Sequence, residues 1–457
     1  MSDGELGTEH ADAVRRALSD KDVSHVMLGV VDLDGVLRAK HLSTDKILRA
    51  LDGEGRFCDV VLGFDSNDEV YENTEITGWH TGFPDVPVRV ALETWRPLAG
   101  QRRTYLLIAD CGGHLEQICP RRTLRRVLDR AREMGFGVSA ALEYEFVLLE
   151  ETPHSVRDKS YQGLRPITPG AFAYSALRSS VWRELYDEII ATCDEIRAPL
   201  EALHAESGPG AFEAAIKVDD ALEAADRGVV FKTFVKAVAE RRGLMATFMS
   251  RWSADWPGQG GHVHVSLQDL DGGSAFHDPD RPDGMTATMR HFVGGAQALL
   301  PDLCAMFAPT VNSYTRLAPG AWAPTTATWG IENRTCALRV IPGGPGSQRL
   351  EHRVPGADAN PYLAVAAVIA SGLWGIEHEI EPPAPVTGNA YEQPSESAPP
   401  LPASLGEAAA RLSGSRSAAE LLGSPFVEHF ARTREWEEAD FRRAITDWEL
   451  ARYLEVI

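Results

Sequence analysis

The chain is poor in cysteine, with six in 457 residues, and no two of them are spaced as a CxxC pair. A chain of this size with so few thiols is not expected to depend on disulfides, which indicates a reducing cytoplasm. The acidic N-terminus has no apolar run, so we expect no signal peptide. The longest apolar stretch, residues 362–376, is too short to span a bilayer, which predicts a cytoplasmic protein without a membrane partner.

Positively charged residues are also scarce: the chain has 45 Lys and Arg and 66 Asp and Glu. Its formal net charge is -21. Nucleic acid backbones require a basic surface, so a nucleic acid partner is not expected. The chain contains no GxxxxGK[ST] loop, which disfavours a P-loop ATPase. Its 44% hydrophobic and 24% charged residues are typical of a soluble globular protein, and its length favours two domains.

Strand and turn signals dominate the first part of the chain. Two strand-like runs, residues 26–32 and 36–40, flank the hairpin signal Asp34-Gly35, and residues 104–110 form a third run. Beyond Pro120, strand patterns alternate with helical ones. The sequence therefore predicts an α+β protein with an N-terminal helix or tail (residues 1–22, helical at 9–19), a β-rich domain (23–112) and a larger domain (117–457).

The larger domain has a set of expected elements and one expected surface loop. Strands are predicted at residues 138–149, 262–267 and 335–341. Helices are predicted at residues 123–134, 181–195, 231–241, 289–298 and 362–378, and around 432–449. Residues 382–402 are rich in Pro, Ser and Glu, which predicts a surface loop.

Two short motifs place pairs of ionisable side chains on one face of a strand. Glu143 and Glu145 are two residues apart in an apolar run, and His262 and His264 repeat that spacing. Residues i and i+2 of a strand point to the same side, so the two carboxylates would repel each other unless a cation or proton lies between them. Taken alone, a solvent-facing strand edge explains the acidic pair equally well, and an HxH pair is weak evidence for a metal or phosphate site.

Further acids and arginines follow along the chain. Glu206 and Glu213 bracket a Gly-Pro-Gly turn that could bring their carboxylates together, although two surface acids around a loop have the same pattern. Arg349, Glu351 and Arg353 alternate along a strand, as a row of ion pairs would; Arg334 is expected in a turn and Arg339 in the following strand. Oxygen-rich ligand sets suit Mg²⁺ or Mn²⁺, and metal ions with arginines provide what phosphoryl transfer requires.

The order of these motifs, together with residues 312–324 and Asn360-Pro361-Tyr362-Leu363, resembles the glutamine synthetase family over nearly the whole chain. The resemblance implies a small β-grasp domain followed by a catalytic domain with a curved antiparallel sheet and surrounding helices. It also implies ATP and L-glutamate as substrates, two or three Mg²⁺ or Mn²⁺ ions per site, and a homo-oligomer of two stacked rings (a dodecamer) with sites at subunit interfaces.

Site residues are carried over by that resemblance, position by position. One divalent ion would be held by Glu145, Glu206 and Glu213, and a second by Glu143, His262 and Glu351. Nucleotide contacts would come from Glu201, His264 and Ser266, and contacts with the ATP phosphates from Arg334 and Arg339. Glutamate and its activated form would be held by Gly258, Arg316 and Arg353, and Arg334 and Arg353 would steady the intermediate. Asp65, contributed by a neighbouring subunit, loosely matches an ammonium-binding aspartate and is the first candidate for the base; Glu332 is the second.

One position departs from the family in a way that bears on function. Where ammonia-using members carry Gly-Tyr-Glu-Ala-Pro, this chain has Gly320-Ala321-Trp322-Ala323-Pro324. An indole cannot recruit ammonium through a carboxylate, but it offers apolar area and an aromatic face to a larger amine. The chain therefore resembles the γ-glutamyl-polyamine or γ-glutamyl-ethanolamine ligase branch, which serves amine assimilation or detoxification in nitrogen metabolism. Simple packing of Trp322 within its loop is the alternative explanation.

Two other functions are compatible with the sequence. The chain could be an ordinary glutamine synthetase despite Trp322, or a non-catalytic ring-forming relative. The second alternative is disfavoured, because all six metal-ligand positions hold competent residues. Tyr391 lies where some bacterial members carry a regulatory tyrosine, but the matching run is too short to predict that regulation.

Overall fold

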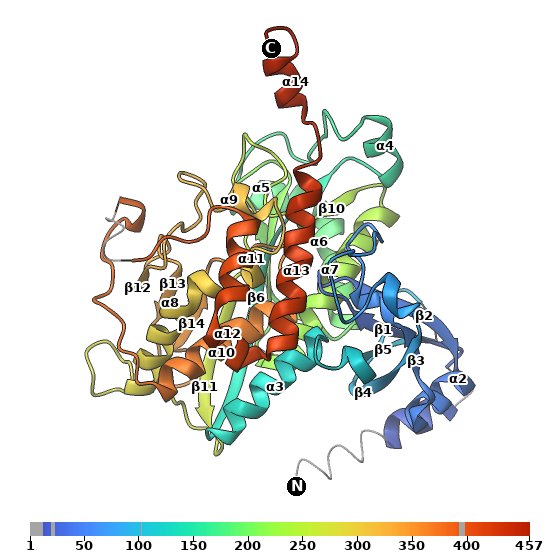
Figure 1. The fold of residues 1–457 in the computed structure, drawn as a ribbon, viewed down its shortest axis with the longest axis horizontal. Helices are drawn as coiled ribbons and strands as arrows, with labels where there is room; N and C mark the ends of the chain where they lie inside the picture. Colours follow the sequence, from blue (N-terminus) through green and yellow to red (C-terminus); the bar gives the residue numbers. More distant parts are fainter. Residues whose placement is uncertain (1–11, 20–22, 102, 393–397) are drawn as a thin grey trace.

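Strands from the first quarter of the chain form a mixed sheet of five (Figure 1). The computed structural model describes residues 12–19, 23–101, 103–392 and 398–457. In this first sheet the order is β2-β1-β5-β4-β3, with β1 and β5 parallel at its centre. The strands are β1 (His25–Val31), β2 (Leu37–Ser43), β3 (Arg56–Cys58), β4 (Asp85–Pro97) and β5 (Thr104–Cys111), with helix α2 (Thr44–Arg49) after β2.

The second sheet has nine strands and curves around the candidate site. Its path runs β12-β13-β14-β11-β6-β8-β7, and β9 and β10 also pair with β6. All of these pairs are antiparallel except β12 with β13. The strands are β6 (Phe136–Leu149), β7 (Leu200–Ala205), β8 (Ala211–Ile216), β9 (Asp219–Asp220), β10 (Met245–Thr247), β11 (Val263–Asp269), β12 (Trp329–Ile331), β13 (Leu338–Ile341) and β14 (Arg349–His352).

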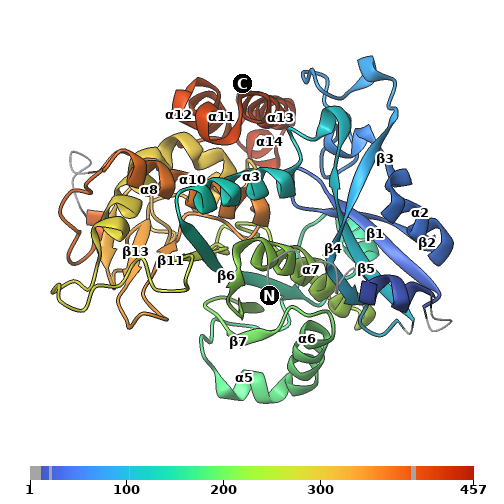
Figure 2. The same ribbon diagram turned by 90° about the horizontal axis from the view of Figure 1, so that it is seen from below.

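Helices cover the convex side of this sheet in two layers (Figure 2). The inner layer contains α10 (Pro361–Glu377), which packs between α8 (Ala287–Phe307) and α3 (Pro120–Glu133). Helix α10 is apolar on every side and almost wholly buried, as a helix between two layers must be. Helices α11 (Leu405–Gly414), α12 (Arg416–Leu422) and α13 (Ser424–Phe441) lie outside it.

Further helices pack on β6 and lie at the chain end. Helix α7 (Ala221–Arg241) packs on β6, and α6 (Arg183–Glu195) packs on α7. Helices α4 (Pro153–Asp158) and α5 (Ala176–Val181) are short. The last helix, α14 (Asp447–Tyr453), extends away from the body of the molecule (Figure 1).

A buried arginine connects the two sheets. Arg121, at the start of α3, donates to Asp110 of β5 at 3.0 Å and to Asp226 of α7 at 2.8 and 2.9 Å. Tyr362 donates its hydroxyl to the same Asp226. Nearby, the Asn360 side chain donates to the backbone oxygens of Asp32 and Leu33. These contacts fix the first sheet against the helices that support the second.

The structure confirms the predicted α+β class and most predicted elements, with differences where helices begin and break. The predicted helix at 181–195 is divided at Trp182 into α5 and α6. The helix predicted at 231–241 begins ten residues earlier, where Asp220 caps its N-terminus. The helix predicted at 289–298 continues through Pro301 to Phe307, and the one around 432–449 is interrupted between α13 and α14.

Several N-terminal and loop predictions fall partly outside the described residues. Residues 12–19 are helical, whereas 9–11 and 20–22 lie outside the described part, as do 393–397 of the predicted loop. All six cysteines are free thiols. Within the described residues, no helix has both the length and the apolar character needed to cross a membrane.

Candidate active site

Four neighbouring strands present their charged side chains to the same face of the second sheet. Along β6 the even-numbered residues from Val138 to Phe146 are buried, while Glu143 and Glu145 are turned to the other face. The register sets His264 of β11 opposite Glu351 of β14, and Glu351 opposite Arg339 of β13. Opposed residues of an antiparallel pair share a face. Strand alternation therefore gathers these groups without any contribution from loops.

This face forms a cavity of about 350 Å³ that contains most of the predicted site. All six predicted metal ligands line it, as do the four predicted arginines and Gly258. Tyr174, Pro257, Ala321 and Trp322 form its uncharged wall. The full lining is Glu143, Glu145, Tyr174, Glu206, Ser207, Glu213, Pro257, Gly258, His262, Arg316, Ala321, Trp322, Arg334, Arg339, Glu351 and Arg353.

Glu206 shows that this cavity suits a cation. Burial and the facing carboxylates of Glu145 and Glu213 raise the pKa of Glu206 to about 7. Its Oε2 is buried and has no hydrogen-bond partner. Three converging carboxylates with an unpartnered oxygen fit a hard divalent ion, which would remove the repulsion and accept that oxygen as a ligand.

A second group of ligands is held by hydrogen bonds and ion pairs. Glu143 contacts His262 Nδ1 at 3.4 Å and His264 Nε2 at 3.1 Å, and Glu351 lies 3.6 Å from His262 Nδ1. Burial alone would raise the pKa of Glu143, but the bonds with both histidines outweigh it and hold that pKa well below its usual range. Glu143, His264 and Glu351 have ligand atoms close enough for one ion. Either histidine therefore has the position of a metal ligand beside the two acids.

Arginines surround Glu351 on the other side. Arg339 donates to Glu351 Oε2 at 2.9 Å and to Glu332 Oε2 at 2.6 Å, and Arg353 is paired with Glu351 Oε1. Arg353 also donates its Nε to the backbone oxygen of Arg334. As predicted, Arg334 lies in a turn and Arg339 in a strand. The guanidinium groups thus lie next to the acids that would hold metal. From there they can donate hydrogen bonds to the oxygens of a bound phosphate.

Arg316 lines the cavity, is buried, and has no carboxylate partner among the described residues. Its guanidinium donates to the backbone oxygens of Val354 at 2.8 Å and Arg353 at 3.1 Å. Burial lowers the pKa of Arg316 from its ordinary value. A side chain at position 258 would clash with Arg316, because a Cβ there would lie 2.7 Å from Arg316 Cγ and 2.5 Å from the Ser250 oxygen. Gly258 therefore permits the arginine to occupy this place.

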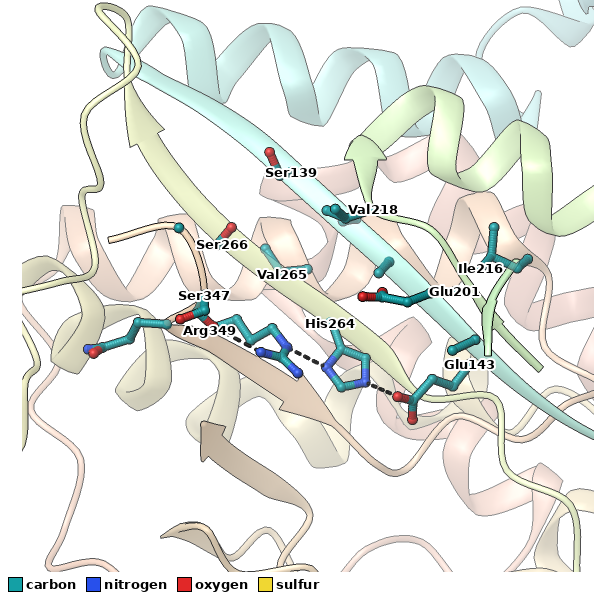
Figure 3. A pocket seen from close by; sticks show the side chains of 15 residues that line it. Ser139, Glu143, Glu201, Ile216, Val218, His264, Val265, Ser266, Ser347 and Arg349 are labelled. Carbon is teal, nitrogen blue, oxygen red and sulfur yellow. Dashed lines mark hydrogen bonds and ion pairs between the residues drawn. The ribbon is translucent and has the colours of Figure 1, made fainter. Parts of the chain in front are cut away.

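A second cavity, of about 220 Å³, adjoins the first and shares Glu143 with it (Figure 3). It brings together the three predicted nucleotide-contact residues, Glu201, His264 and Ser266. Arg349 also lines it and donates its Nε to His264 Nδ1 at 3.2 Å. Arg349 was expected on the same strand face as Glu351 and Arg353, but it was not among the predicted site residues.

Two aromatic side chains at the mouth of the first cavity have unusual backbones. Tyr174 has φ 57° and is 73% exposed, and Trp322 has φ 56° and is 72% exposed. A bulky residue in the left-handed region costs about 1–3 kcal/mol, and such strain is concentrated at functional sites. The carboxylate of Glu206 is the main cause of the raised pKa of Tyr174, which indicates that its hydroxyl lies toward the acids. Tyr174 lies in an irregular segment without a pattern, so its place at the cavity was not predicted from the sequence.

Three residues considered from the sequence do not line this cavity within one chain. Asp65 lies between β3 and β4, where its carboxylate accepts hydrogen bonds from the backbone N–H groups of Asn67 and Glu69. Glu332 is engaged by Arg339. Tyr391 lies near Arg353 and Arg316, whose positive charges oppose the effect of burial, and the pKa of Tyr391 is raised overall.

Known proteins are similar to this chain over most of its length. Residues 117–453 match the family described as glutamine synthetase, catalytic domain. Type-1 glutamine synthetase 2 of Dictyostelium discoideum is 41% identical over 432 residues, which cover 93% of this chain and 82% of that protein. A glutamate–isopropylamine ligase of Pseudomonas sp is 37% identical over 97% of this chain and 98% of its own length.

Two further similarities extend over nearly the whole chain. The γ-glutamylethanolamide synthetase GlnA4 of Streptomyces coelicolor is 34% identical over 98% of this chain and 96% of its own length. The solved structure of a GmaS/ADP complex superposes with a TM-score of 0.84 at 30% identity, covering 96% of this chain and 99% of that one.

Proposed function

Because the chain belongs to the glutamine synthetase family of ATP-dependent ligases, we propose that it joins the γ-carboxylate of glutamate to an organic amine. The observation that carries this proposal is Trp322, which stands at the mouth of the carboxylate-lined cavity in place of the glutamate expected of an ammonia-using member. Two of the relatives are named for amines, isopropylamine in one and the ethanolamide product in the other. Polyamines and ethanolamine, the classes that the family resemblance implies, both carry primary amino groups that this chemistry can use.

The proposed reaction has two steps. The glutamate γ-carboxylate attacks the γ-phosphorus of ATP, which forms γ-glutamyl phosphate and releases ADP. The neutral amine then attacks the γ-carbonyl carbon, a C–N bond forms, and inorganic phosphate leaves. In this scheme Arg316 binds the glutamate, and Arg334, Arg339 and Arg353 neutralise phosphate charge in both steps.

Divalent metal ions would be held by the acids of the first cavity. Glu145, Glu206 and Glu213 would hold one ion, and Glu143, Glu351 and His262 a second; Mg²⁺ or Mn²⁺ suits these oxygen-rich sets. When bound, the ions would neutralise negative charge on the transferred phosphoryl group. Glu201, His264, Ser266 and Arg349 would contact the nucleotide from the adjoining cavity.

The amine must lose a proton, for which we propose Asp65 of a neighbouring subunit. Glu332, the second candidate, is a weaker choice because one of its oxygens is engaged by Arg339. A site that uses a residue of a neighbouring subunit requires an oligomer. We propose the dodecamer of two stacked rings that the family resemblance implies. In support, the projecting C-terminal segment exposes Trp448, Leu454, Val456 and Ile457, as a segment that packs against another copy would.

A direct assay tests the proposed function. The protein is incubated with ATP, Mg²⁺ and glutamate, and ADP release is measured with ammonia, ethanolamine, isopropylamine, putrescine and spermidine in turn. Release that depends on glutamate and is faster with an organic amine than with ammonia is expected. If ammonia exceeds every organic amine, the protein is a glutamine synthetase, the function that the 41% identical relative bears by name.

A further inference from the structure

His204 contacts two residues that line the first cavity, although it does not line the cavity itself. It belongs to β7, where it is paired with Glu213 of β8, and Glu213 is in turn paired with Glu145 of β6. Directly opposed residues of antiparallel strands point to the same face, so the imidazole extends the row of two carboxylates. Its Nε2 lies 3.4 Å from Oε1 of Glu213, and both side chains are partly buried.

The same imidazole contacts Tyr174. The two ring centroids are 4.8 Å apart, and the ring planes meet at 41°. The backbone oxygen of Ala205 accepts a hydrogen bond from the Tyr174 N–H at 2.8 Å and lies 3.3 Å from His204 Nδ1. Tyr174 needs such support, because its side chain is largely exposed and its backbone is left-handed. His204 therefore has a carboxylate on one side and an aromatic ring on the other.

The contact with Glu213 bears on metal binding. Glu213 is one of the three acids proposed for the first ion, and a carboxylate ligand must direct an oxygen at its metal. A hydrogen bond to one carboxylate oxygen fixes the rotation of the group and so the direction of the other oxygen. The oxygen that faces His204 is Oε1, which leaves Oε2 available to an ion. Loss of a partner of this kind typically lowers metal affinity about 10- to 100-fold.

We propose that His204 is a positioning residue that connects the first metal-ion site to the amine-binding part of the cavity. It orients the Glu213 carboxylate through Nε2 and supports the Tyr174 ring through its own ring. This inference rests on the proposed function, since it takes Glu213 as a metal ligand and Tyr174 as a contact of the amine. Nucleotide binding should depend little on His204, because none of these three residues lines the adjoining cavity.

Two variants separate the two contacts. His204→Gln keeps an N–H donor for Glu213 but loses the ring, whereas His204→Phe keeps a ring for Tyr174 but loses the donor. Mn²⁺ binding to the full-length protein is measured without substrates, by electron paramagnetic resonance of the unbound ion, and Glu213→Gln identifies the ion that depends on this carboxylate. For that ion, His204→Phe should raise Kd about tenfold or more, and His204→Gln less than about threefold.

Amine use gives the second measurement, at saturating Mn²⁺, ATP and glutamate. The amine is the one that the wild-type protein uses best, with ammonia included in the comparison. His204→Gln should lower its kcat/KM about two- to tenfold, as expected for the loss of one ring contact. Combined with Tyr174→Ala, His204→Gln should add less than about twofold to the loss, because both changes remove the same contact. The KM for ATP should stay within about twofold of the wild-type value, which also shows that the variants are folded.

His378→Gln is the matched control. His378 also places its imidazole against an aromatic ring, that of Trp374, at a centroid distance of 4.7 Å, but it lines neither cavity. Its Mn²⁺ affinity and its amine kcat/KM should equal those of the wild type. Changes as large as those of the His204 variants would show that any lost ring contact has these effects, and the role assigned to His204 would be wrong.

Other results would also overturn the role of His204. These are wild-type Mn²⁺ affinity in His204→Phe, wild-type amine kcat/KM in His204→Gln, and additive losses with Tyr174→Ala. A loss of the ion in His204→Gln as complete as in Glu213→Gln would make His204 a metal ligand instead. The proposed function fails by different results: Mn²⁺ binding that Glu213→Gln leaves unchanged, or a wild-type protein that uses ammonia better than every organic amine.

Discussion

Glu145 of β6 lies directly opposite Glu213 of β8 in an antiparallel register, so that two carboxylates share one face of the sheet. Like charges in this arrangement destabilise a sheet. Glu206, at the end of the neighbouring strand, adds a third carboxylate to the pair. A cation bound between these carboxylates would replace their mutual repulsion with attraction to the ion.

Without metal, folding stability should depend on the protonation of Glu206. Its pKa is raised in the folded protein from 4.5 to about 7, so between these values the folded state binds a proton that the unfolded state releases. Stability is therefore expected to fall as the pH rises through this window. The melting temperature of the metal-free protein, measured from about pH 5 to about pH 7.5, should decrease more steeply than that of Glu206→Gln.

Addition of Mn²⁺ at about pH 7.5 should restore the melting temperature of the wild-type protein, and much less that of the variant, because the ion needs the ionised carboxylate. Parallel pH curves for the two metal-free proteins would contradict this account of the carboxylate cluster.

Trp322→Glu should shift amine preference toward ammonia. The new carboxylate would attract ammonium, and the lost indole would remove apolar area from the cavity wall. We expect kcat/KM to rise about tenfold or more for ammonia and to fall by about the same factor for n-propylamine. Trp322→Gln separates the two effects, since it loses the ring without adding charge and should show only the fall. An unchanged preference in Trp322→Glu would show that the ring does not select the amine.

Substitution of Arg316 should raise the KM for glutamate and leave the KM for ATP nearly unchanged. Its buried guanidinium has only backbone carbonyl partners among the described residues, which leaves donors for a substrate carboxylate. Lysine preserves the charge but loses the paired donors, so Arg316→Lys should raise the glutamate KM about 10- to 100-fold. The KM for ATP, measured on the same preparation, should change less than about twofold. Equal changes in both constants, or a large drop in melting temperature, would indicate a structural role instead.

Arg121 should contribute far more to stability than the neighbouring Arg125. Arg121→Met would leave Asp110 and Asp226 buried with their main cation removed, which costs about 3–5 kcal/mol. Arg125 is more exposed, and Arg125→Met should cost less than about 1 kcal/mol. Urea unfolding monitored by circular dichroism measures both values. Similar midpoints for the two variants would contradict the importance of this buried network.

Removal of residues 444–457 should reduce the assembly without unfolding the chain. This segment contains α14 and projects from the body, so few contacts within the chain depend on it. Light scattering coupled to size exclusion should show a smaller species than the full chain, with unchanged circular dichroism per residue. An unchanged mass would exclude this segment as an essential interface.

Many residues singled out from the sequence line one cavity, and strand geometry explains part of this convergence. The spacing of Glu143 and Glu145, and of Glu351 and Arg353, places the members of each pair on one face, and that step needs no long-range information. The pairing of Glu145 with Glu213 could not be derived in this way, since the register depends on the whole sheet. The resemblance to a known family, rather than the physics of the chain, indicated that these strands would meet.

Residues outside regular elements were the hardest to predict. Tyr174 precedes α5 in an irregular segment, and its place at the cavity depends on a left-handed backbone that no local pattern indicates. Helix α8 continues through Pro301, where a sequence rule places a break, because burial on both sides of the proline compensates for one lost hydrogen bond. In both places tertiary packing overrides the local preference.

The left-handed backbones at positions 174 and 322 set a limit on laboratory evolution of this chain. Glycine at either position would relieve the steric clash and favour a higher melting temperature, while it removed part of the surface that distinguishes one amine from another. A selection for heat resistance alone would therefore be expected to reduce the discrimination between amines first. A selection that also required discrimination would preserve both rings and collect its stabilising substitutions elsewhere.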